Sequence, residues 1–131
     1  MAQLSEEAGK LFDDPNLLFV ATINPDGSPQ LTCAWTDRQD GYIRFNTAIG
    51  RAKERNLRRD PRVALSVVSR DDVYDKVDVR GRVVEFIEGD AADAHIDDLS
   101  EKYTGRRPYA SRREGERRVT VVVEPERVYG G

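Results

Sequence analysis

Alternating apolar and polar residues along most of this chain predict β-strands, because successive side chains of a strand point to opposite faces of its sheet. Turn-forming residues separate seven such segments, which are 17–23, 29–36, 42–46, 63–68, 73–87, 119–124 and 127–129. The segment 17–23 is apolar at nearly every position, which predicts a strand buried on both faces. Asn24-Pro25-Asp26-Gly27-Ser28 follows it and predicts a hairpin into the second strand.

Turn-forming residues, a glycine and a proline predict where three of these strands end or bend. The residues 37–41 have turn composition and predict a second hairpin after the strand 29–36. Gly81 falls on the apolar side of the segment 73–87, which predicts a bend or the close approach of another backbone. Pro125 predicts the end of the strand 119–124.

Helical periodicity is confined to short segments. We expect helices over 4–12, from about 51 to 60, and over 90–103. The last has an apolar stripe formed by Ala92, Ile96, Leu99 and Tyr103. Asp90 is its expected N-cap and Gly105 its expected stop. His95 lies beside the stripe, so we expect it at the surface or at an interface.

Six or seven strands joined by hairpins, with few and short helices, predict a mainly β protein built as a closed antiparallel barrel. A length of 131 residues fits one domain, 1–131. Closed barrels remove exposed edges and leave mouths in which ligands bind. The apolar stripe of the helix 90–103 and the open barrel end leave apolar surface to cover, which predicts a homodimer.

Composition narrows the chemistry. The chain contains no apolar run near the ~20 residues that span a membrane. Its first ten residues are polar and acidic, unlike a secretory signal, so we expect a cytoplasmic protein. One cysteine and one histidine exclude an internal disulfide and give no metal cluster. The apolar neighbours of Cys33 predict a core residue rather than a reactive thiol.

Positive charge is concentrated although the net charge is −3. Residues 51–62 hold six Arg or Lys against two acids, and a second basic cluster extends from Arg106 to Arg118. The acidic overall balance argues against nonspecific nucleic-acid binding, and 51–62 contains no aromatic residue on which a base could stack. A small anion in a local basic pocket remains compatible with this pattern.

The segment from Tyr42 to Arg62 predicts such a pocket. A strand leads through a polar, glycine-containing turn into a helix whose first turn carries Arg51 and Lys53. Helix N-termini offer unpaired N–H groups and the positive end of the dipole, and both cations suit phosphate. The alternative is a solvated basic helix face.

The order of residues in this segment resembles a known family. Phe45-Asn46-Thr47-x-x-Gly50-Arg51-x-Lys53-x-x-Asn56-Leu57-x-Arg59-Asp60-Pro61-Arg62 resembles the pyridoxamine-5′-phosphate-oxidase-like split β-barrel superfamily, and more narrowly its F420-dependent branch. Further matches are Ala21-Thr22-x-x-Pro25-Asp26-Gly27-x-Pro29-Gln30, Ala34-Trp35, Tyr103-Thr104-Gly105 and Pro125-Glu126-Arg127-Val128. The similarity covers nearly the whole chain.

This resemblance implies a six- or seven-stranded Greek-key split barrel of the FMN-binding type, assembled as a homodimer with cofactor sites at the interface. It implies that Arg51 and Lys53 hold the cofactor phosphate and that Asn46 and Thr47 contact the phosphate or the ribityl chain. Ala34, Trp35 and Thr36 would line the ring, and Asn56 is a weaker candidate. The cofactor would be coenzyme F420, or alternatively FMN.

The implied activity is hydride transfer from the cofactor to a small conjugated or heteroaromatic substrate, with no catalytic side chain assigned. The alternative is a carrier or sensor that binds the cofactor without turnover. The chain lacks the C-terminal extension of true pyridoxamine-phosphate oxidases, which favours F420. Four arginines of the loop 104–117 are candidates to grip its polyglutamate tail, Arg106, Arg107, Arg112 and Arg113. Three tyrosines are candidates to close the pocket from the partner subunit, Tyr74, Tyr103 and Tyr109.

Overall fold

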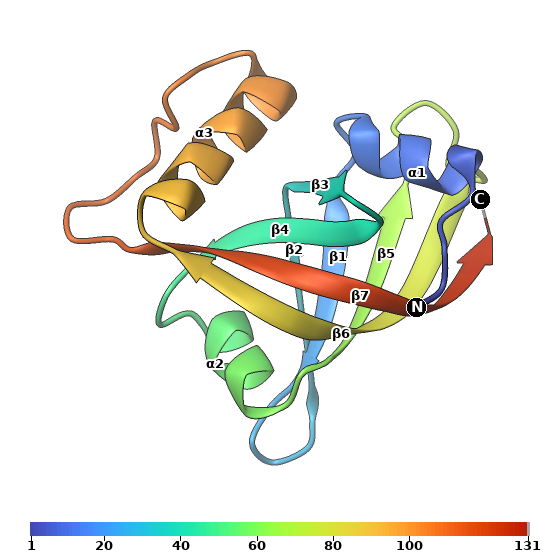
Figure 1. Cartoon of the computed structure of the whole chain (residues 1–131), viewed down its shortest axis with the longest axis horizontal. Coiled ribbons are helices and arrows are strands. Elements are labelled where there is room, and N and C mark those ends of the chain that lie inside the picture. Colours follow the sequence, from blue (N-terminus) through green and yellow to red (C-terminus); the bar gives the residue numbers. More distant parts are fainter. Residues whose placement is uncertain (131) are drawn as a thin grey trace.

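A computed structural model describes residues 1–130 as one seven-stranded antiparallel sheet with three helices (Figure 1). In chain order the elements are α1 (Glu6–Asp13), β1 (Leu18–Ile23), β2 (Pro29–Ala34), β3 (Thr36–Gln39), β4 (Tyr42–Ala48), α2 (Ala52–Arg59), β5 (Arg62–Val68), β6 (Lys76–Glu88), α3 (Asp90–Thr104) and β7 (Arg118–Gly130). The sheet order is β2-β1-β5-β6-β7-β4-β3. The predicted mainly β, split-barrel fold is confirmed.

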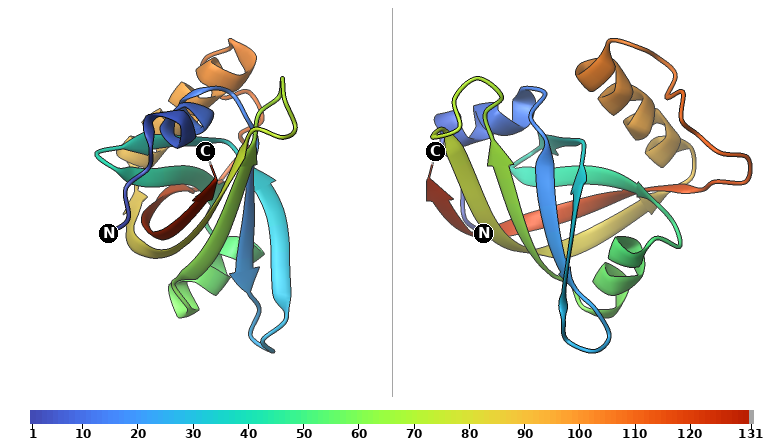
Figure 2. Two further views of the ribbon diagram at one scale, coloured as in Figure 1. Left: turned by 90° about the vertical axis from the view of Figure 1, so that its right-hand side faces the viewer. Right: turned by 180° about the vertical axis from the view of Figure 1, so that it is seen from behind.

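The sheet curls so that its two edge strands, β2 and β3, come close to each other (Figures 1 and 2). These two strands are also consecutive along the chain. Only Trp35 separates β2 from β3, although β2 pairs with β1 and β3 pairs with β4. The prediction of a single strand over 29–36 is therefore wrong, because the chain changes its pairing partner at Trp35. We call this junction the seam of the barrel.

The hairpin after β3 is tighter than the sequence predicts. Gln39 pairs with Tyr42, so the turn consists of Asp40 and Gly41 rather than of residues 37–41. Both have positive φ, 55° and 84°, as a two-residue hairpin turn requires.

The core lies inside the curl of the sheet and beneath α1. The largest fully buried apolar side chains include Phe12 of α1, Leu18 of β1, Ile43 and Phe45 of β4, and Val121 of β7. Alternation along each strand places these residues on the concave face. Their burial, at roughly 1.5–3 kcal/mol per large side chain, is the main force that holds the curl together.

The opposite face of β1 and β2 is exposed and apolar. Phe19 is 41% exposed and Leu31 is 67% exposed, so the prediction that β1 is buried on both faces is wrong. Cys33 pairs with Phe19 across the ladder and is exposed with it, which corrects its assignment to the core. With Tyr129 of β7, these residues form what we call the outer apolar face.

Another backbone comes close at Gly81, as the sequence predicts, and the glycine lies at a β-bulge. The register of β6 against β7 shifts between Arg80 and Gly81, and a Cβ at Gly81 would lie 2.6 Å from the carbonyl oxygen of Glu124. Pro125 pairs with Gly81 at this irregularity and does not end β7, which corrects that prediction, because bulges tolerate a residue without an N–H group. The predicted start of this strand at residue 73 is also too early, since Val73 is 70% exposed ahead of β6.

Helix α3 ends at Gly105 in the left-handed conformation, as predicted, but its N-cap is Gly89 rather than Asp90. Three residues of its apolar stripe, Ala92, Ile96 and Leu99, are buried within the chain, where α3 packs against β7, β6 and β4, and Tyr103 is half-buried. The stripe therefore gives no support to the predicted dimer. His95 is 4% exposed, so its predicted surface position is also wrong. No helix within residues 1–130 is long and apolar enough to cross a membrane.

Candidate functional site

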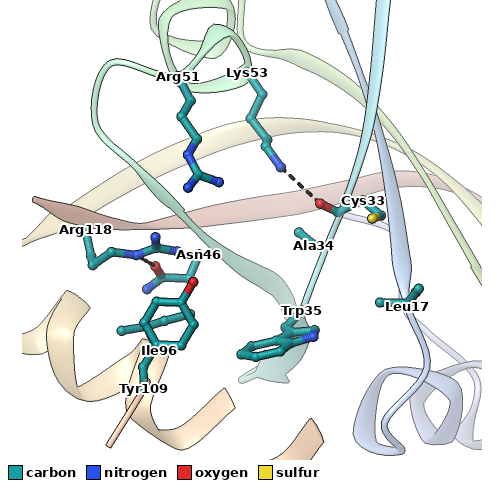
Figure 3. A pocket seen from close by; sticks show the side chains of 10 residues that line it. All are labelled: Leu17, Cys33, Ala34, Trp35, Asn46, Arg51, Lys53, Ile96, Tyr109 and Arg118. Carbon is teal, nitrogen blue, oxygen red and sulfur yellow. Dashed lines mark hydrogen bonds between the residues drawn. The ribbon is translucent and has the colours of Figure 1, made fainter. Parts of the chain in front are cut away.

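A cavity of about 180 Å³ opens at the seam, where β2, β4, α2, α3 and the start of β7 meet (Figure 3). Ten residues line it: Leu17, Cys33, Ala34, Trp35, Asn46, Arg51, Lys53, Ile96, Tyr109 and Arg118. Five of the eight residues that the sequence indicates are among them, Ala34, Trp35, Asn46, Arg51 and Lys53. The strand–turn–helix unit from β4 to α2 supplies three of these five.

Two cations enter the cavity from the start of α2. Arg51 is the N-cap of the helix and has no side-chain capping bond, while Lys53 lies in the first turn and is 6% exposed. The Lys53 Nζ donates a hydrogen bond of 3.2 Å to the carbonyl oxygen of Cys33. Burial lowers the pKa of Lys53, and the positive charges of Arg51 and Arg118 lower it further. A bound anion would relieve this repulsion.

Arg118 is a third cation of the cavity. It is the first residue of β7, is 4% exposed, and donates from Nε to the Asn46 side-chain oxygen at 2.9 Å. Its Nη1 is buried and has no hydrogen-bond partner among residues 1–130. Burial lowers the pKa of Arg118, and the nearby charge of Glu116 opposes that shift. A buried guanidinium nitrogen without a hydrogen bond is a donor that an anionic ligand would satisfy.

Asn46 holds Arg118 in place through buried contacts. Its amide nitrogen donates to the carbonyl oxygen of Ala92 at 3.0 Å and lies 3.3 Å from the His95 Nδ1. The other side of His95 faces Asp37, with 3.2 Å between Nε2 and Oδ2, while its Nδ1 lies 2.7 Å from the Thr120 hydroxyl. A continuous buried polar network thus leads from β3 through α3 to the cavity.

Asp37 anchors the far end of this network. Arg44 donates two hydrogen bonds to its carboxylate, at 2.9 and 2.8 Å. Burial raises the pKa of Asp37, but the hydrogen bonds from His95 and Arg44 prevail and hold that pKa below the ordinary 3.8. The carboxylate is therefore charged at neutral pH.

Aromatic rings form the other wall. Trp35 stacks on Tyr103, with ring centroids 5.3 Å apart, and meets the edge of Tyr109 at 5.8 Å. Tyr103 donates to the carbonyl oxygen of Asn16 at 2.6 Å, and burial raises its pKa to about 12, so it stays neutral and braces Trp35. Both tyrosines reach Trp35 from their own chain. Tyr74, in contrast, is 91% exposed in the turn before β6.

Three predicted site residues do not line the cavity. Thr36 is fully buried and donates to the carbonyl oxygen of Arg44 at 2.6 Å. Thr47 is 1% exposed. Asn56 donates to Thr22 and Asn24, both at 2.9 Å, and so fastens α2 to the hairpin between β1 and β2.

Of the other five cavity residues, Tyr109 is a candidate that the sequence indicates, and four escape local sequence patterns. Leu17, Cys33 and Ile96 occupy apolar positions of a strand or a helix, which predicts core rather than site. Arg118 is the last residue of the basic cluster that begins at Arg106, and the apolar strand starts at the same point. That position is the one sequence signal that the Arg118 side chain is buried. Within residues 1–130, no group of three or more His, Cys, Asp or Glu side chains is placed to hold a metal ion.

The curled sheet and the cavity at its seam define a split-barrel protein whose cavity places three cations beside an aromatic surface. The model of the pyridoxamine 5′-phosphate oxidase family matches residues 4–130, and the chain belongs to that family. Comparison with curated proteins finds no match.

Solved structures with the same fold include proteins of different description. An F420 reductase is 30% identical, with a TM-score of 0.84 over 96% of this chain and 98% of its own. A conserved hypothetical protein from Mycobacterium tuberculosis is 31% identical, with a TM-score of 0.74 over 98% of this chain and 88% of its own. A putative pyridoxamine 5′-phosphate oxidase from Lactobacillus delbrueckii shares the fold at 22% identity, with a TM-score of 0.70 over 98% and 94%.

Proposed function

We propose that this protein is an oxidoreductase that binds coenzyme F420, with FMN as the alternative, and passes a hydride to a small conjugated or heteroaromatic substrate. One observation carries the proposal. Arg51, Lys53 and Arg118 meet at one end of a cavity whose other end is walled by Trp35 (Figure 3). A phosphate joined to a planar ring system has this distribution of charge and apolar surface.

The residues present fit such a cofactor. The buried Nη1 of Arg118, which has no hydrogen-bond partner among residues 1–130, offers a donor for a phosphate oxygen, and the first turn of α2 adds the N–H groups of a helix N-terminus. Ala34 is small, so a ring can approach the backbone at the end of β2. When bound, F420 or FMN supplies the hydride chemistry, and the chain supplies binding, orientation and exclusion of water.

Thr36 and Asn56 support this site from behind. Thr36 joins β3 to β4 beside Trp35, and Asn56 fixes the orientation of α2 against β1. The network from Asp37 to Asn46 orients Arg118. Each acts on the cofactor through a residue that lines the cavity.

The preference for F420 over FMN depends on the part of the cofactor that lies beyond the phosphate. F420 continues beyond its phosphate into an anionic glutamate tail, whereas FMN ends there. In the loop after α3, Arg107 pairs with Asp98 at 2.6 Å and Arg112 with Asp97 at 3.3 Å. Arg106 and Arg113 are exposed, and we assign the tail to them. The 30% identity to an F420 reductase over nearly the whole chain agrees with this choice.

We further propose that two copies complete each site. Leu17 is 45% exposed and Cys33 is exposed, and both line the cavity. They continue directly into the outer apolar face, where Phe19 pairs with Cys33. A second copy placed on that face would cover these apolar side chains and close the cavity.

The test is a titration with F420 and with FMN, followed through the fluorescence of Trp35, the chain's one tryptophan. We expect saturable quenching by both and tighter binding of F420, with an advantage that shrinks as salt rises. Reduced F420 should then be oxidised when a quinone such as menadione is added. Quenching without such oxidation would favour a carrier, and no quenching by either cofactor would refute the proposal.

A further inference from the structure

A carboxylate lies among the cations of the cavity. Glu116, in the loop before β7, has a side chain that is 8% exposed. Its Oε1 is 3.4 Å from the Arg118 Nη1 and 3.7 Å from the Arg51 Nη2. One oxygen is thus shared by two of the three cations that we assign to the phosphate.

This ion pair is loose. Within the described residues 1–130, neither the Arg118 Nη1 nor the Glu116 Oε2 has a hydrogen-bond partner, although both are buried. The pair of Arg44 with Asp37 differs, because the Arg44 guanidinium donates two hydrogen bonds, of 2.9 and 2.8 Å, to the carboxylate. In a buried ion pair without hydrogen bonds, the attraction between the charges offsets only part of the free energy lost when both groups are desolvated. The geometry leaves donors of Arg118 free for another anion.

Glu116 also has space on its far side. A cavity of about 120 Å³ is lined by Glu116 and Arg118 together with two further acids, Glu88 and Asp93. Arg117 lines the same cavity, and Glu88 is paired with Arg58 at 3.0 Å, so Asp93 in the first turn of α3 is the acid there without an ion pair among the described residues. An anion that binds Arg51 and Arg118 must share them with this carboxylate.

We propose that Glu116 is the internal counter-ion of the anion site and that it selects against phosphate groups carrying two negative charges. Three cations and one carboxylate give the site two net positive charges. A phosphate monoester such as FMN carries close to two negative charges at neutral pH, because its second pKa is about 6. The phosphate of F420 is esterified on both sides and carries one. Repulsion by Glu116 grows with that charge, so it lowers the affinity for FMN more than for F420.

This inference rests on the proposed function and is tested by Glu116→Gln beside Glu114→Gln. Glu114 is exposed in the same loop, so both variants change the net charge by one but only the first changes the cavity. Dissociation constants for FMN, F420 and riboflavin, which has no phosphate, are read from Trp35 fluorescence. We expect Glu116→Gln to bind FMN about tenfold and F420 about threefold more tightly, with riboflavin unchanged. Glu114→Gln should stay within about twofold of the unaltered protein.

Equal gains for FMN and riboflavin, or no gain for FMN, would overturn the role of Glu116. If Glu116→Gln does not fold, Glu116→Asp keeps the charge but withdraws it by one methylene. It should then favour FMN by about threefold relative to F420, and an unchanged ratio would overturn the proposal.

The same variants separate this inference from the proposed function. If no cofactor binds any of them, the proposed function fails, and inorganic phosphate becomes the probe. A larger rise in melting temperature with phosphate in Glu116→Gln than in Glu114→Gln supports the counter-ion role. Equal rises refute it.

Discussion

The Lys53 Nζ lies 3.2 Å from the carbonyl oxygen of Cys33 and ties the first turn of α2 to the edge strand β2. The two residues are neighbours in the lining of the cavity, one charged and one apolar (Figure 3). Because Lys53 is only 6% exposed, its charged form loses solvation free energy. The low polarity around it strengthens the electrostatic interactions that the charge makes. Its position makes it the most direct test of the phosphate site.

Lys53→Met should weaken binding of F420 and FMN by roughly 1.5–3 kcal/mol, the worth of a charge-assisted hydrogen bond, while riboflavin binding stays unchanged. The same loss is expected for Arg51→Ala. Fluorescence titration of Trp35 measures both. Lys10→Met, which alters a lysine with a 74% exposed side chain on α1, is the control. Unchanged affinity in both site variants would remove α2 from the cofactor site.

Binding of the phosphate-bearing cofactors should weaken as pH rises, and should do so below the ordinary lysine pKa of 10.5. The reason is that burial, with Arg51 and Arg118, lowers the pKa of Lys53, so its charge is lost earlier than that of an exposed lysine. A bound anion favours the charged form, so binding in this range should take up a proton. Titrations in buffers of different ionisation enthalpy measure that uptake. A pH profile that is the same in Lys53→Met would contradict the assignment.

Asp37→Asn should destabilise the fold by about 2–3 kcal/mol at neutral pH, because it leaves Arg44 without its charged partner. The folded pKa of Asp37 lies below 3.8, so the carboxylate's contribution is complete above pH 3.8 and is lost as pH falls through the folded value. The difference between the two proteins in urea unfolding should therefore shrink in acid. A difference that is constant with pH would show that packing, rather than charge, is what the variant disturbs.

Gly81→Ala should cost about 2–4 kcal/mol, because the added Cβ would meet the Glu124 carbonyl oxygen at 2.6 Å inside the β6–β7 ladder. Gly27→Ala is the matched control. A Cβ there meets no atom of the described chain within 4 Å and suffers only from a φ of +86°, at a cost of about 1 kcal/mol. Thermal unfolding compares the two. Equal losses would mean that the close approach at the bulge is relieved by small shifts of β7.

Leu31→Asp should convert the proposed homodimer into a monomer of 14.8 kDa, since it places a charge in the centre of the outer apolar face. It should also weaken cofactor binding, because the partner no longer closes the cavity. Val84→Asp, at a 47% exposed apolar site that lines neither that face nor the cavity, should change neither. Sedimentation at micromolar concentration gives the masses. A monomeric unaltered protein would refute the dimer.

Local pattern was sufficient for most of the elements and for bringing Asn46, Arg51 and Lys53 to one cavity. The unit from β4 to α2 places Asn46, Arg51 and Lys53 within 8 residues of sequence, so its geometry is set by its own strand, turn and helix. The alternation through 29–36 gave no sign of the break at Trp35, because neither glycine nor proline marks it. The change of partner there depends on β1 and β4, which local pattern does not contain.

The polar network behind the cavity could not be predicted for the same reason. His95 has apolar neighbours on its helix, and its partners Asp37 and Thr120 come from β3 and β7. Burial of a histidine is favourable only once those partners are in place. Arg118 and Glu116 likewise become part of the cavity only through their proximity to Arg51, which is more than sixty residues away in sequence.

The order of strands in the sheet bears on how fast the chain can fold. Three neighbouring pairs, β1–β2, β3–β4 and β5–β6, are close in sequence and can form early. The pairs β1–β5 and β4–β7 join distant segments, such as Phe45 with Val121, and must wait for large loops to close. A topology rich in distant pairings folds slowly, on the scale of milliseconds to seconds. Because Trp35 covalently links strands at the two edges, the cavity takes shape only when the last of these ladders has closed.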